Sequence, residues 1–227
     1  MDDPETAARA AAAAAAVELV EPGMTIGLGS GRAVWKVAEL LGERGGPVRA
    51  AVASTRTDEV ARDAGIEVVE LDGEIELDLA LDGADELDSS LRLIKGGGGA
   101  MLRERIVVAA ARRFVVVAET RKRVERLGQG FRLPVEVVGF AWRDTRRRLA
   151  ALLPDAELRV RDGGEPYLTD EGNHVLDCAI PADLDLDGLD SGLLRIPGVV
   201  DHGLFIGVAE RALLGRPDGG VDVLEGS

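Results

Sequence analysis

LALDGADELDSSLRLIKGGGGAMLRERIVVAAA, residues 79–111, is the stretch of sequence that decides the expected fold. The apolar residues at 77–81 form a short run bounded by turn residues, which is typical of a buried β-strand. Such a strand delivers Asp82 and Asp85 to its carboxyl end, where α/β sheets bind their ligands. The stretch therefore predicts a functional site at one edge of a sheet.

The four glycines that follow Lys95 predict a loop, because each glycine loses more backbone entropy than alanine on ordering. The exposed N–H groups of such a loop, Gly96 to Gly99, can converge on an anion. Helical spacing returns over residues 100–112, which places Glu104 near a helix N-terminus. There the helix dipole stabilises a carboxylate while burial raises its pKa, and this balance can tune a general base.

Each of these residues also has an ordinary structural explanation. The acids would be solvated turn residues, the glycines a flexible loop, and Glu104 a surface residue of its helix. However, a strand end, an acid pair, a lysine, a glycine loop and a helical carboxylate all converge on one edge. This convergence favours a catalytic site.

Strand and helix signals alternate through the first half of the chain. Residues 5–20 are rich in alanine, the best helix former, and Pro22-Gly23 ends the expected helix. Ser54 and Thr55 predict a helix N-cap, although they could equally face a sugar. The alternation predicts an α/β fold with a doubly wound, mostly parallel, Rossmann-like sheet. The expected strands span residues 24–28, 48–53, 66–71, 77–81 and 114–118, and the expected helices span residues 5–20, 32–44, 54–64 and 100–112.

The pattern of the sequence changes at residues 128–133, which predicts a domain boundary. Residues 1–130 are expected to form the Rossmann-like catalytic domain, and residues 131–202 a small α+β domain. Residues 203–227 are expected to return to the catalytic domain as a strand and a helix, followed by a tail from Arg216. Within the small domain we expect strands at 135–139 and 158–161, a helix at 142–153, and a hairpin at 167–180 that turns on residues 170–173.

Composition limits the possible partners and location. The chain of 227 residues is 46% hydrophobic and can bury a sizeable core. Its formal charge of −14, from 41 acids against 27 bases, argues against nucleic acid or an anionic membrane as a partner. The single Cys178 excludes an internal disulfide and suits a reducing compartment. Because the N-terminus lacks the basic region of a signal peptide and no long apolar stretch follows, we expect a cytoplasmic protein.

Any phosphate site in this acidic chain must be a local basic pocket. Gly29-Ser30-Gly31 lies between an expected strand and an expected helix N-terminus, an arrangement that binds phosphate. The dinucleotide fingerprint G-x-G-x-x-G fails because Arg32 stands where its third glycine is required, so no nicotinamide cofactor is expected. Basic residues also gather at 112–126, which a solvated helix face alone does not explain. The two histidines and Cys178 lack the spacing of a metal site, so no metal is expected.

Five motifs occur together without any structural reason to do so: DGADELD at 82–88, IKGGGGAMLRE at 94–104, PVEVV at 134–138, GNHVLD at 172–177 and PGVVDHGLF at 197–205. Through them the chain resembles ribose-5-phosphate isomerase of type A over nearly its whole length, from about Arg9 to Leu214. The resemblance implies interconversion of D-ribose 5-phosphate and D-ribulose 5-phosphate through an enediolate, in the non-oxidative branch of the pentose phosphate pathway. It also implies a homodimer or homotetramer with no metal and no organic cofactor.

The residue types suit this chemistry. Moving a carbonyl from C1 to C2 needs one base that carries a proton between adjacent carbons, and donors that stabilise the enediolate oxygen. By the resemblance, Glu104 would carry the proton, and Lys95 with the amides of Gly96, Gly97, Gly98 and Gly99 would stabilise the oxyanion. Asp82 and Asp85, with Gly83 and Ala84 between them, would orient hydroxyl groups and assist opening of the furanose ring. The phosphate would be bound by Arg9, Ser30, Gly31, Arg32, Ala33 and Lys122.

The chain departs from the pattern of that family at Arg9, at residues 30–33 and at Arg121, which stands where the family usually has a serine. A lysine that reaches the phosphate in the family is Arg9 here, which keeps the charge. The family usually reads TGST where this chain reads SGRA at 30–33, so two hydroxyls are lost and a guanidinium is added. Arg32 can replace the hydroxyls by binding phosphate through two hydrogen bonds. It can equally point to solvent, or favour a different anionic substrate.

Three other functions remain open from the sequence. The first is a related sugar-phosphate isomerase of altered specificity, suggested by the SGRA segment. The second is a non-catalytic sugar-phosphate sensor on the same fold, although such a protein would not need a base at Glu104. The third is a metal site at Asp82, Asp85 and Asp88, whose spacing matches no calcium-loop pattern.

Overall fold

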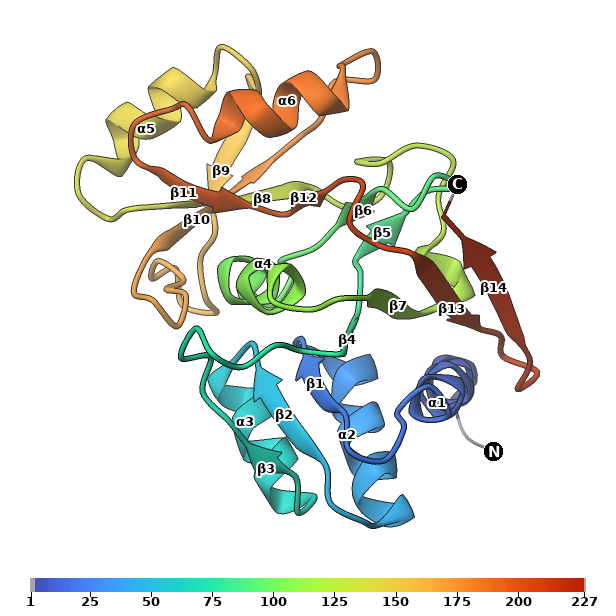
Figure 1. Ribbon diagram of the computed structural model, residues 1–227. Helices are drawn as coiled ribbons and strands as arrows, with labels where there is room; N and C mark the ends of the chain where they lie inside the picture. Colours follow the sequence, from blue (N-terminus) through green and yellow to red (C-terminus); the bar gives the residue numbers. More distant parts are fainter. Residues whose placement is uncertain (1–2, 227) are drawn as a thin grey trace.

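A seven-stranded sheet forms the centre of the computed structural model, which describes residues 3–226 (Figure 1). Its order is β14-β13-β7-β4-β1-β2-β3, and each neighbouring pair is parallel except β13 and β14. The order reverses between β1 and β4, because the chain continues from β1 toward one edge and from β4 toward the other. Ligands of open α/β sheets bind at such a reversal. The strands are β1 (Thr25–Leu28), β2 (Arg49–Val52), β3 (Glu67–Val68), β4 (Leu79–Asp82), β7 (Phe114–Glu119), β13 (Arg211–Gly215) and β14 (Val221–Glu225).

Helices cover both faces of this sheet, which confirms the predicted α/β class (Figure 1). On one face α1, α2 and α3 form a core with Leu79 and Leu81 of β4. On the other face α4 packs against Ala80 of the same strand. Successive residues of a strand point to opposite faces, so a strand covered on both sides is apolar throughout. The helices are α1 (Pro4–Val17), α2 (Arg32–Arg44), α3 (Thr55–Asp63) and α4 (Met101–Ala109).

Two smaller antiparallel sheets lie beside the central one. The four-stranded sheet has the order β11-β8-β10-β9, and α5 and α6 share its core (Figure 1). The three-stranded sheet has the order β12-β6-β5 and contains the chain that follows β4. The remaining elements are β5 (Glu86–Leu87), β6 (Leu93–Ile94), the 3-10 helix η1 (Thr120–Lys122), β8 (Leu133–Val137), α5 (Trp142–Leu149), β9 (Ala156–Leu158), β10 (His174–Cys178), α6 (Leu186–Leu193), β11 (Val199–His202) and β12 (Leu204–Phe205).

Most expected elements are present, with some differences in extent. The helix α2 spans the expected residues 32–44, whereas β3 has two residues where 66–71 was expected. The strand expected at 158–161 is displaced to β9, Ala156–Leu158. The turn predicted at 170–173 is formed, because the Gly172 N–H donates to the carbonyl of Thr169. Only the second arm of that hairpin, β10, is a strand of the sheet.

The C-terminal segment differs from the expected helix and tail. Residues 211–215 form β13 and residues 221–225 form β14, which pair as a hairpin at the sheet edge. Both faces of β13 are covered, so its residues 212–214 are all apolar and buried. Periodicity does not distinguish so short an apolar run in a strand from one in a helix. The division into two domains stays a prediction, and residues 1, 2 and 227 lie outside the described part of the chain.

The alanine-rich helix α1 packs very close to the central sheet. Its buried face consists mainly of alanines, which project little from the helix. At the contact with β13, a Cβ on Gly215 would lie 1.7 Å from the carbonyl oxygen of Ala8. The distance between helix and sheet therefore requires glycine at this position. None of the described helices, α1 included, is long and apolar enough to cross a membrane.

The close packing of α1 predicts that Gly215→Ala destabilises the protein. The added methyl group must displace the helix backbone, and overpacking of this kind costs about 1–3 kcal/mol or more. The control is Gly139→Ala, where the nearest atom to a new Cβ lies at an ordinary 3.5 Å. Urea unfolding of both variants measures the difference. Equal stability of the two variants would contradict the packing described here.

Candidate active site

A pocket of about 490 Å³ opens at the carboxyl ends of β1 and β4, where the strand order reverses. Its wall includes β7, several helices, the loops that follow β1, β4 and β6, and the turn before β10. Nearly all residues predicted from the sequence line it, and Asp82 is the exception. The predicted residues that line the pocket are Arg9, Ser30, Gly31, Arg32, Ala33, Gly83, Ala84, Asp85, Lys95, Gly96, Gly97, Gly98, Gly99, Glu104 and Lys122.

Asp82 ends β4 and lies behind the pocket wall, 1% exposed. Its Oδ1 accepts hydrogen bonds from the N–H groups of Gly83 at 2.7 Å and Ser30 at 3.2 Å. The carboxylate is so close to β1 that a Cβ on Gly29 would lie 1.8 Å from its Cγ. The position of Asp82 thus depends on glycine at 29, and its carboxylate supports the site from behind.

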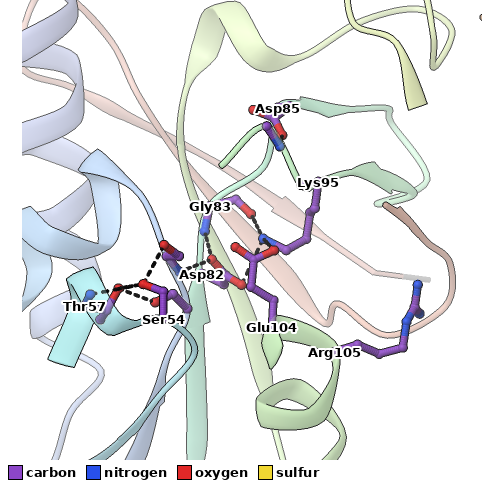
Figure 2. Close-up of polar contacts among 12 residues, drawn as sticks. Ser54, Thr57, Asp82, Gly83, Asp85, Lys95, Glu104 and Arg105 are labelled. Carbon is purple, nitrogen blue, oxygen red and sulfur yellow. Dashed lines mark hydrogen bonds and ion pairs between the residues drawn. The ribbon is translucent and has the colours of Figure 1, made fainter. Parts of the chain in front are cut away.

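Lys95 follows β6 and extends its ammonium group to three acceptors, as Figure 2 shows. Its Nζ donates to the carbonyl oxygen of Gly83 at 2.7 Å. It also lies 2.9 Å from Asp82 Oδ2 and 3.2 Å from Glu104 Oε2. The lysine side chain is 2% exposed, so these contacts replace nearly all of its hydration. The ammonium is thereby fixed between the two carboxylates.

Glu104 lies in the first turn of α4, as the sequence predicted, and is 4% exposed. The pKa of Glu104 is raised to about 8, because burial and the nearby Asp82 carboxylate both raise it and Lys95 opposes them only in part. Burial also raises the pKa of Asp82, against the effect of Lys95. For Lys95, burial lowers the pKa, but the carboxylates of Asp82 and Glu104 outweigh it and the net shift is upward. The site therefore holds a permanent cation beside a carboxyl group that can exchange a proton near neutral pH.

The glycine loop, Gly96 to Gly99, turns between β6 and α4 at the pocket wall. The Gly97 N–H donates to Asp85 Oδ2 at 2.8 Å, and the Gly99 N–H donates to the carbonyl of Gly96 at 2.9 Å. Two of the four amides expected to face an anion are thus bound within the protein. The amides of Gly96 and Gly98 form no hydrogen bond within residues 3–226. Asp85, unlike Asp82, lies on the pocket wall with its other oxygen 4.0 Å from Lys122 Nζ.

Three hydroxyl groups beside the first turn of α2 form a directed chain of hydrogen bonds (Figure 2). Thr57 Oγ1 accepts from Trp35 Nε1 at 3.1 Å and donates to the carbonyl of Gly29 at 2.9 Å. Its only proton is therefore used, so Ser54 must donate to Thr57 and Ser30 must donate to Ser54. The backbone N–H of Ser30 is also used, by Asp82. In the pocket, Ser30 can therefore only accept hydrogen bonds and cannot donate them.

The N-terminus of α2 remains available for an anion. Gly31 is its N-cap residue, with φ of +109°, and no side chain caps the helix. The N–H groups of the first turn have no partner within a helix, and the helix dipole favours negative charge there. Arg32 and Ala33 line the pocket at this turn, and Arg32 is exposed. In the described part of the chain the Arg32 guanidinium forms no ion pair.

Arg9 also lines the pocket, but its guanidinium is bound to a residue that the sequence did not indicate. Glu119, at the end of β7, lies 3.0 Å from Arg9 Nε and 2.8 Å from its terminal nitrogen. Glu119 is buried and follows an apolar run, so its place at a strand end was the available signal. Arg9 is thus held rigidly at the pocket wall.

Asp170, in the hairpin turn before β10, is another wall residue that was missed. Its Oδ2 accepts from the Thr55 N–H at 2.9 Å and the Thr55 hydroxyl at 3.1 Å, and lies 3.3 Å from Arg103. Nothing in the sequence indicated that this turn reaches across to α3 and α4. Thr55 is therefore bound by Asp170, while Ser54 is the N-cap of α3, accepting from the Thr57 N–H.

The three acids considered as an alternative metal site, Asp82, Asp85 and Asp88, are separated by the fold. Asp88 accepts hydrogen bonds from the N–H groups of Ser90 and Arg92 and pairs with the Arg92 side chain at 2.6 Å. It therefore belongs to a turn of its own. Among residues 3–226, no group of three or more His, Cys, Asp or Glu side chains is placed to hold a metal ion.

Comparison with known proteins agrees with the fold and the pocket. The sequence profile of ribose 5-phosphate isomerase A (phosphoriboisomerase A) matches residues 49–219. The ribose-5-phosphate isomerase A of Roseiflexus castenholzii is 49% identical over 95% of this chain and 94% of that protein. The one from Parvibaculum lavamentivorans is 44% identical over 95% of this chain and 96% of that protein.

Solved structures give the same result. Ribose 5-phosphate isomerase A from Methanocaldococcus jannaschii has a TM-score of 0.90 and 35% identity, covering 98% of this chain and all (100%) of that one. A D-ribose-5-phosphate isomerase in complex with phospho-erythronic acid has a TM-score of 0.92 and 32% identity, covering 99% of this chain and 100% of that one. A profile match over most of the chain and relatives of such identity over nearly its full length establish that this chain belongs to the ribose 5-phosphate isomerase A family.

Proposed function

We propose that Glu104 is the base with which this isomerase interconverts D-ribose 5-phosphate and D-ribulose 5-phosphate. The observation that carries the proposal is a buried carboxyl group with a pKa raised to about 8, in contact with a lysine, at the wall of a sugar-sized pocket. A base with a pKa near the working pH can both take up and release a proton. This is what moving a proton between two carbons requires.

In the proposed reaction the open-chain aldose places C2 beside Glu104. The carboxylate takes the C2 proton, the electrons of the C–H bond form the C1–C2 double bond, and negative charge collects on O1. The same carboxyl group then returns the proton to C1, while the proton of the O2 hydroxyl passes to O1. The product carries its carbonyl at C2, so atoms and electrons balance without an external redox partner.

Lys95 is proposed to stabilise the charge on the enediolate oxygen. Its ammonium is already oriented by Asp82 and Gly83, so little reorganisation is needed as charge develops. In the glycine loop, the amides of Gly96 and Gly98 are the ones left to assist. Asp82 thus acts through Lys95, and Asp85, on the wall, is the carboxylate that can bind sugar hydroxyls.

The phosphate is proposed to bind at the N-terminus of α2. The directed hydroxyl chain leaves Ser30 as an acceptor, so donors must come from the backbone at residues 31–33, from Arg32 and from Lys122. Arg9 adds positive charge from the far wall, although Glu119 offsets part of it. Binding of phospho-erythronic acid to the solved relative supports a pocket for a phosphorylated sugar acid on this fold.

The contact of Lys95 with Glu104 also argues against a non-catalytic sensor. A binding protein gains nothing from burying a second carboxyl group beside Asp82, because the added charge costs free energy. An isomerase of altered specificity differs from the proposal only in the sugar, and comparing ribose 5-phosphate with allose 6-phosphate as substrates would distinguish them.

A cytoplasmic homodimer or homotetramer is also part of the proposal. The buried, unpaired Cys178 suits a reducing compartment. The side chain of Phe140 is 89% exposed beside the partly exposed Val138, which supports burial of this surface between subunits.

We expect that replacing the proposed base, Glu104, abolishes turnover while the protein still folds. Glu104→Gln cannot accept the C2 proton, and general acid–base catalysis contributes at least about 100-fold, so kcat should fall by that factor or more. Ketose formation followed by NMR measures it. The matched control is Glu136→Gln, another buried carboxyl group whose pKa burial raises, which lies outside the pocket wall.

The stability of Glu104→Gln distinguishes lost chemistry from lost structure. Between about pH 4.5 and 8 the folded state holds a proton on Glu104 that the unfolded chain releases, so ionisation there opposes folding. Glutamine removes this effect, and the variant should be at least as stable as the wild type at pH 8. A folded variant that keeps more than about a tenth of the wild-type kcat would show that Glu104 is not the base.

The proposed phosphate contact predicts that Arg32→Ala raises KM and leaves kcat nearly unchanged, because the contact acts equally in ground and transition states. A charged hydrogen bond of roughly 1.5–3 kcal/mol corresponds to about a ten- to hundredfold rise in KM. Lys36→Ala, one turn further along α2 and outside the pocket wall, is the control. If both variants have the wild-type KM for ribose 5-phosphate, Arg32 does not bind the phosphate.

A further inference from the structure

We propose that Arg159, a residue outside the pocket wall, is a positioning residue that orients the peptide groups of the glycine loop for isomerisation. The inference rests on the proposed function, since it concerns how the amides meet the enediolate. Arg159 directly follows β9 of the four-stranded sheet. Its terminal nitrogen NH1 donates to the carbonyl oxygens of Gly96 at 2.9 Å and Gly97 at 3.1 Å. One guanidinium thus holds two consecutive peptide groups.

Arg159 is itself held in place by Asp177 of β10. Its Nε donates to Asp177 Oδ2 at 2.9 Å and its NH2 donates to Asp177 Oδ1 at 2.5 Å. This pair uses two nitrogens of the planar fork and directs the third, NH1, at the loop. The side chains of Arg159 and Asp177 are 14% and 22% exposed, so solvent weakens the pair only partly. A lysine could not make these four bonds at once.

Because of the geometry of the peptide bond, these contacts to carbonyl oxygens also fix the direction of the N–H groups in the loop. In a trans peptide the C=O of one residue and the N–H of the next point in opposite directions. Holding the Gly96 carbonyl therefore directs the Gly97 N–H the other way, where it meets Asp85 at 2.8 Å. Holding the Gly97 carbonyl directs the Gly98 N–H away from Arg159 in the same manner. Gly98 lines the pocket and Arg159 does not, which supports a Gly98 N–H that faces the pocket side.

The Gly97–Gly98 peptide needs such an external restraint, because the hydrogen bond within the loop, from the Gly99 N–H to the Gly96 carbonyl, does not involve it. Glycine occupies positive and negative φ about equally well, so a peptide group between two glycines can flip at little cost. A flipped Gly97–Gly98 peptide would present its carbonyl oxygen to the enediolate and repel it. The guanidinium opposes this flip, and as a cation it also polarises the peptide and strengthens the N–H as a donor.

Tyr167 restrains the next peptide in the same way. Its hydroxyl donates to the carbonyl of Gly98 at 2.7 Å, and a Cβ on Gly99 would lie 2.5 Å from its ring. Three consecutive loop carbonyls are thus bound by side chains that flank β9 and β10. Arg161 stacks on the same tyrosine ring at 5.6 Å, as Arg159 does at 5.7 Å, yet within residues 3–226 Arg161 makes no side-chain hydrogen bond to the loop. It is therefore a matched control.

The test compares Arg159→Ala with Arg161→Ala in the full chain. Loss of one well-placed donor in an oxyanion site costs about 100-fold, so a misdirected amide should lower the kcat of Arg159→Ala about tenfold or more, with a smaller change in KM. Arg161→Ala should retain kcat within about twofold. Methylguanidinium added to Arg159→Ala should restore part of the lost kcat. Arg159→Lys, which keeps the charge and serves if the alanine variant does not fold, should show the loss as well.

A second measurement is independent of turnover. Amide hydrogen exchange of Gly97, followed by NMR without substrate, should be faster by about tenfold or more in Arg159→Ala, because the restraint that directs this N–H to Asp85 is lost. Arg161→Ala should exchange like the wild type. The proposal would be overturned if folded Arg159 variants kept the wild-type kcat and the wild-type exchange rate of the Gly97 amide. Equal losses in Arg159→Ala and Arg161→Ala would overturn it as well. A wild-type protein without isomerase activity would instead refute the proposed function, while the exchange data would still test the restraint.

Discussion

The structure of the site depends on one buried ammonium group shared by two carboxylates. Lys95 lies between Asp82 and Glu104, and all three side chains are almost completely removed from water. With both carboxylates ionised, the cluster would carry an uncompensated negative charge in a medium that solvates charge poorly. The protein avoids this by keeping a proton on Glu104 to a higher pH than usual. The burial that makes the charge costly therefore also raises the pKa of Glu104 to the range that a proton-carrying base requires.

The rest of the fold brings the three groups of this cluster together. Asp82 is delivered by β4 at the reversal of strand order, and the absence of a side chain at Gly29 lets its carboxylate reach β1. Lys95 comes from the small sheet that follows β4, and Glu104 from the first turn of α4. The four-stranded sheet completes the pocket from the opposite side, through the Arg159 contacts to the glycine loop and the Asp170 contact to Thr55. The pocket therefore lies between the central sheet and loops that lead to the smaller sheets.

Much of this arrangement could be predicted from the sequence, because it follows from local rules. Strand ends in a parallel sheet meet at one edge, so the sequence placed Asp82 at the end of β4, where the pocket opens. Long-range side-chain contacts have no such local signal. The sequence therefore did not indicate that Asp85 occupies the Gly97 amide, that Glu119 binds Arg9, or that Asp170 crosses to α3. The prediction of a helix before Arg216 was wrong for a related reason. β13 is buried on both faces, so it lacks the apolar–polar alternation that identifies a strand.

The ionisation of Glu104 tests the central claim most directly. Titration of its side-chain carboxyl carbon by ¹³C NMR, in the full chain without substrate, should give a pKa of about 8 against an ordinary value of 4.5. Because the Asp82 carboxylate raises this pKa and Lys95 lowers it, Asp82→Asn should shift the titration down and Lys95→Met should shift it up. A carboxyl group that titrates near 4.5 in the wild type, or that responds to neither substitution, would contradict the account.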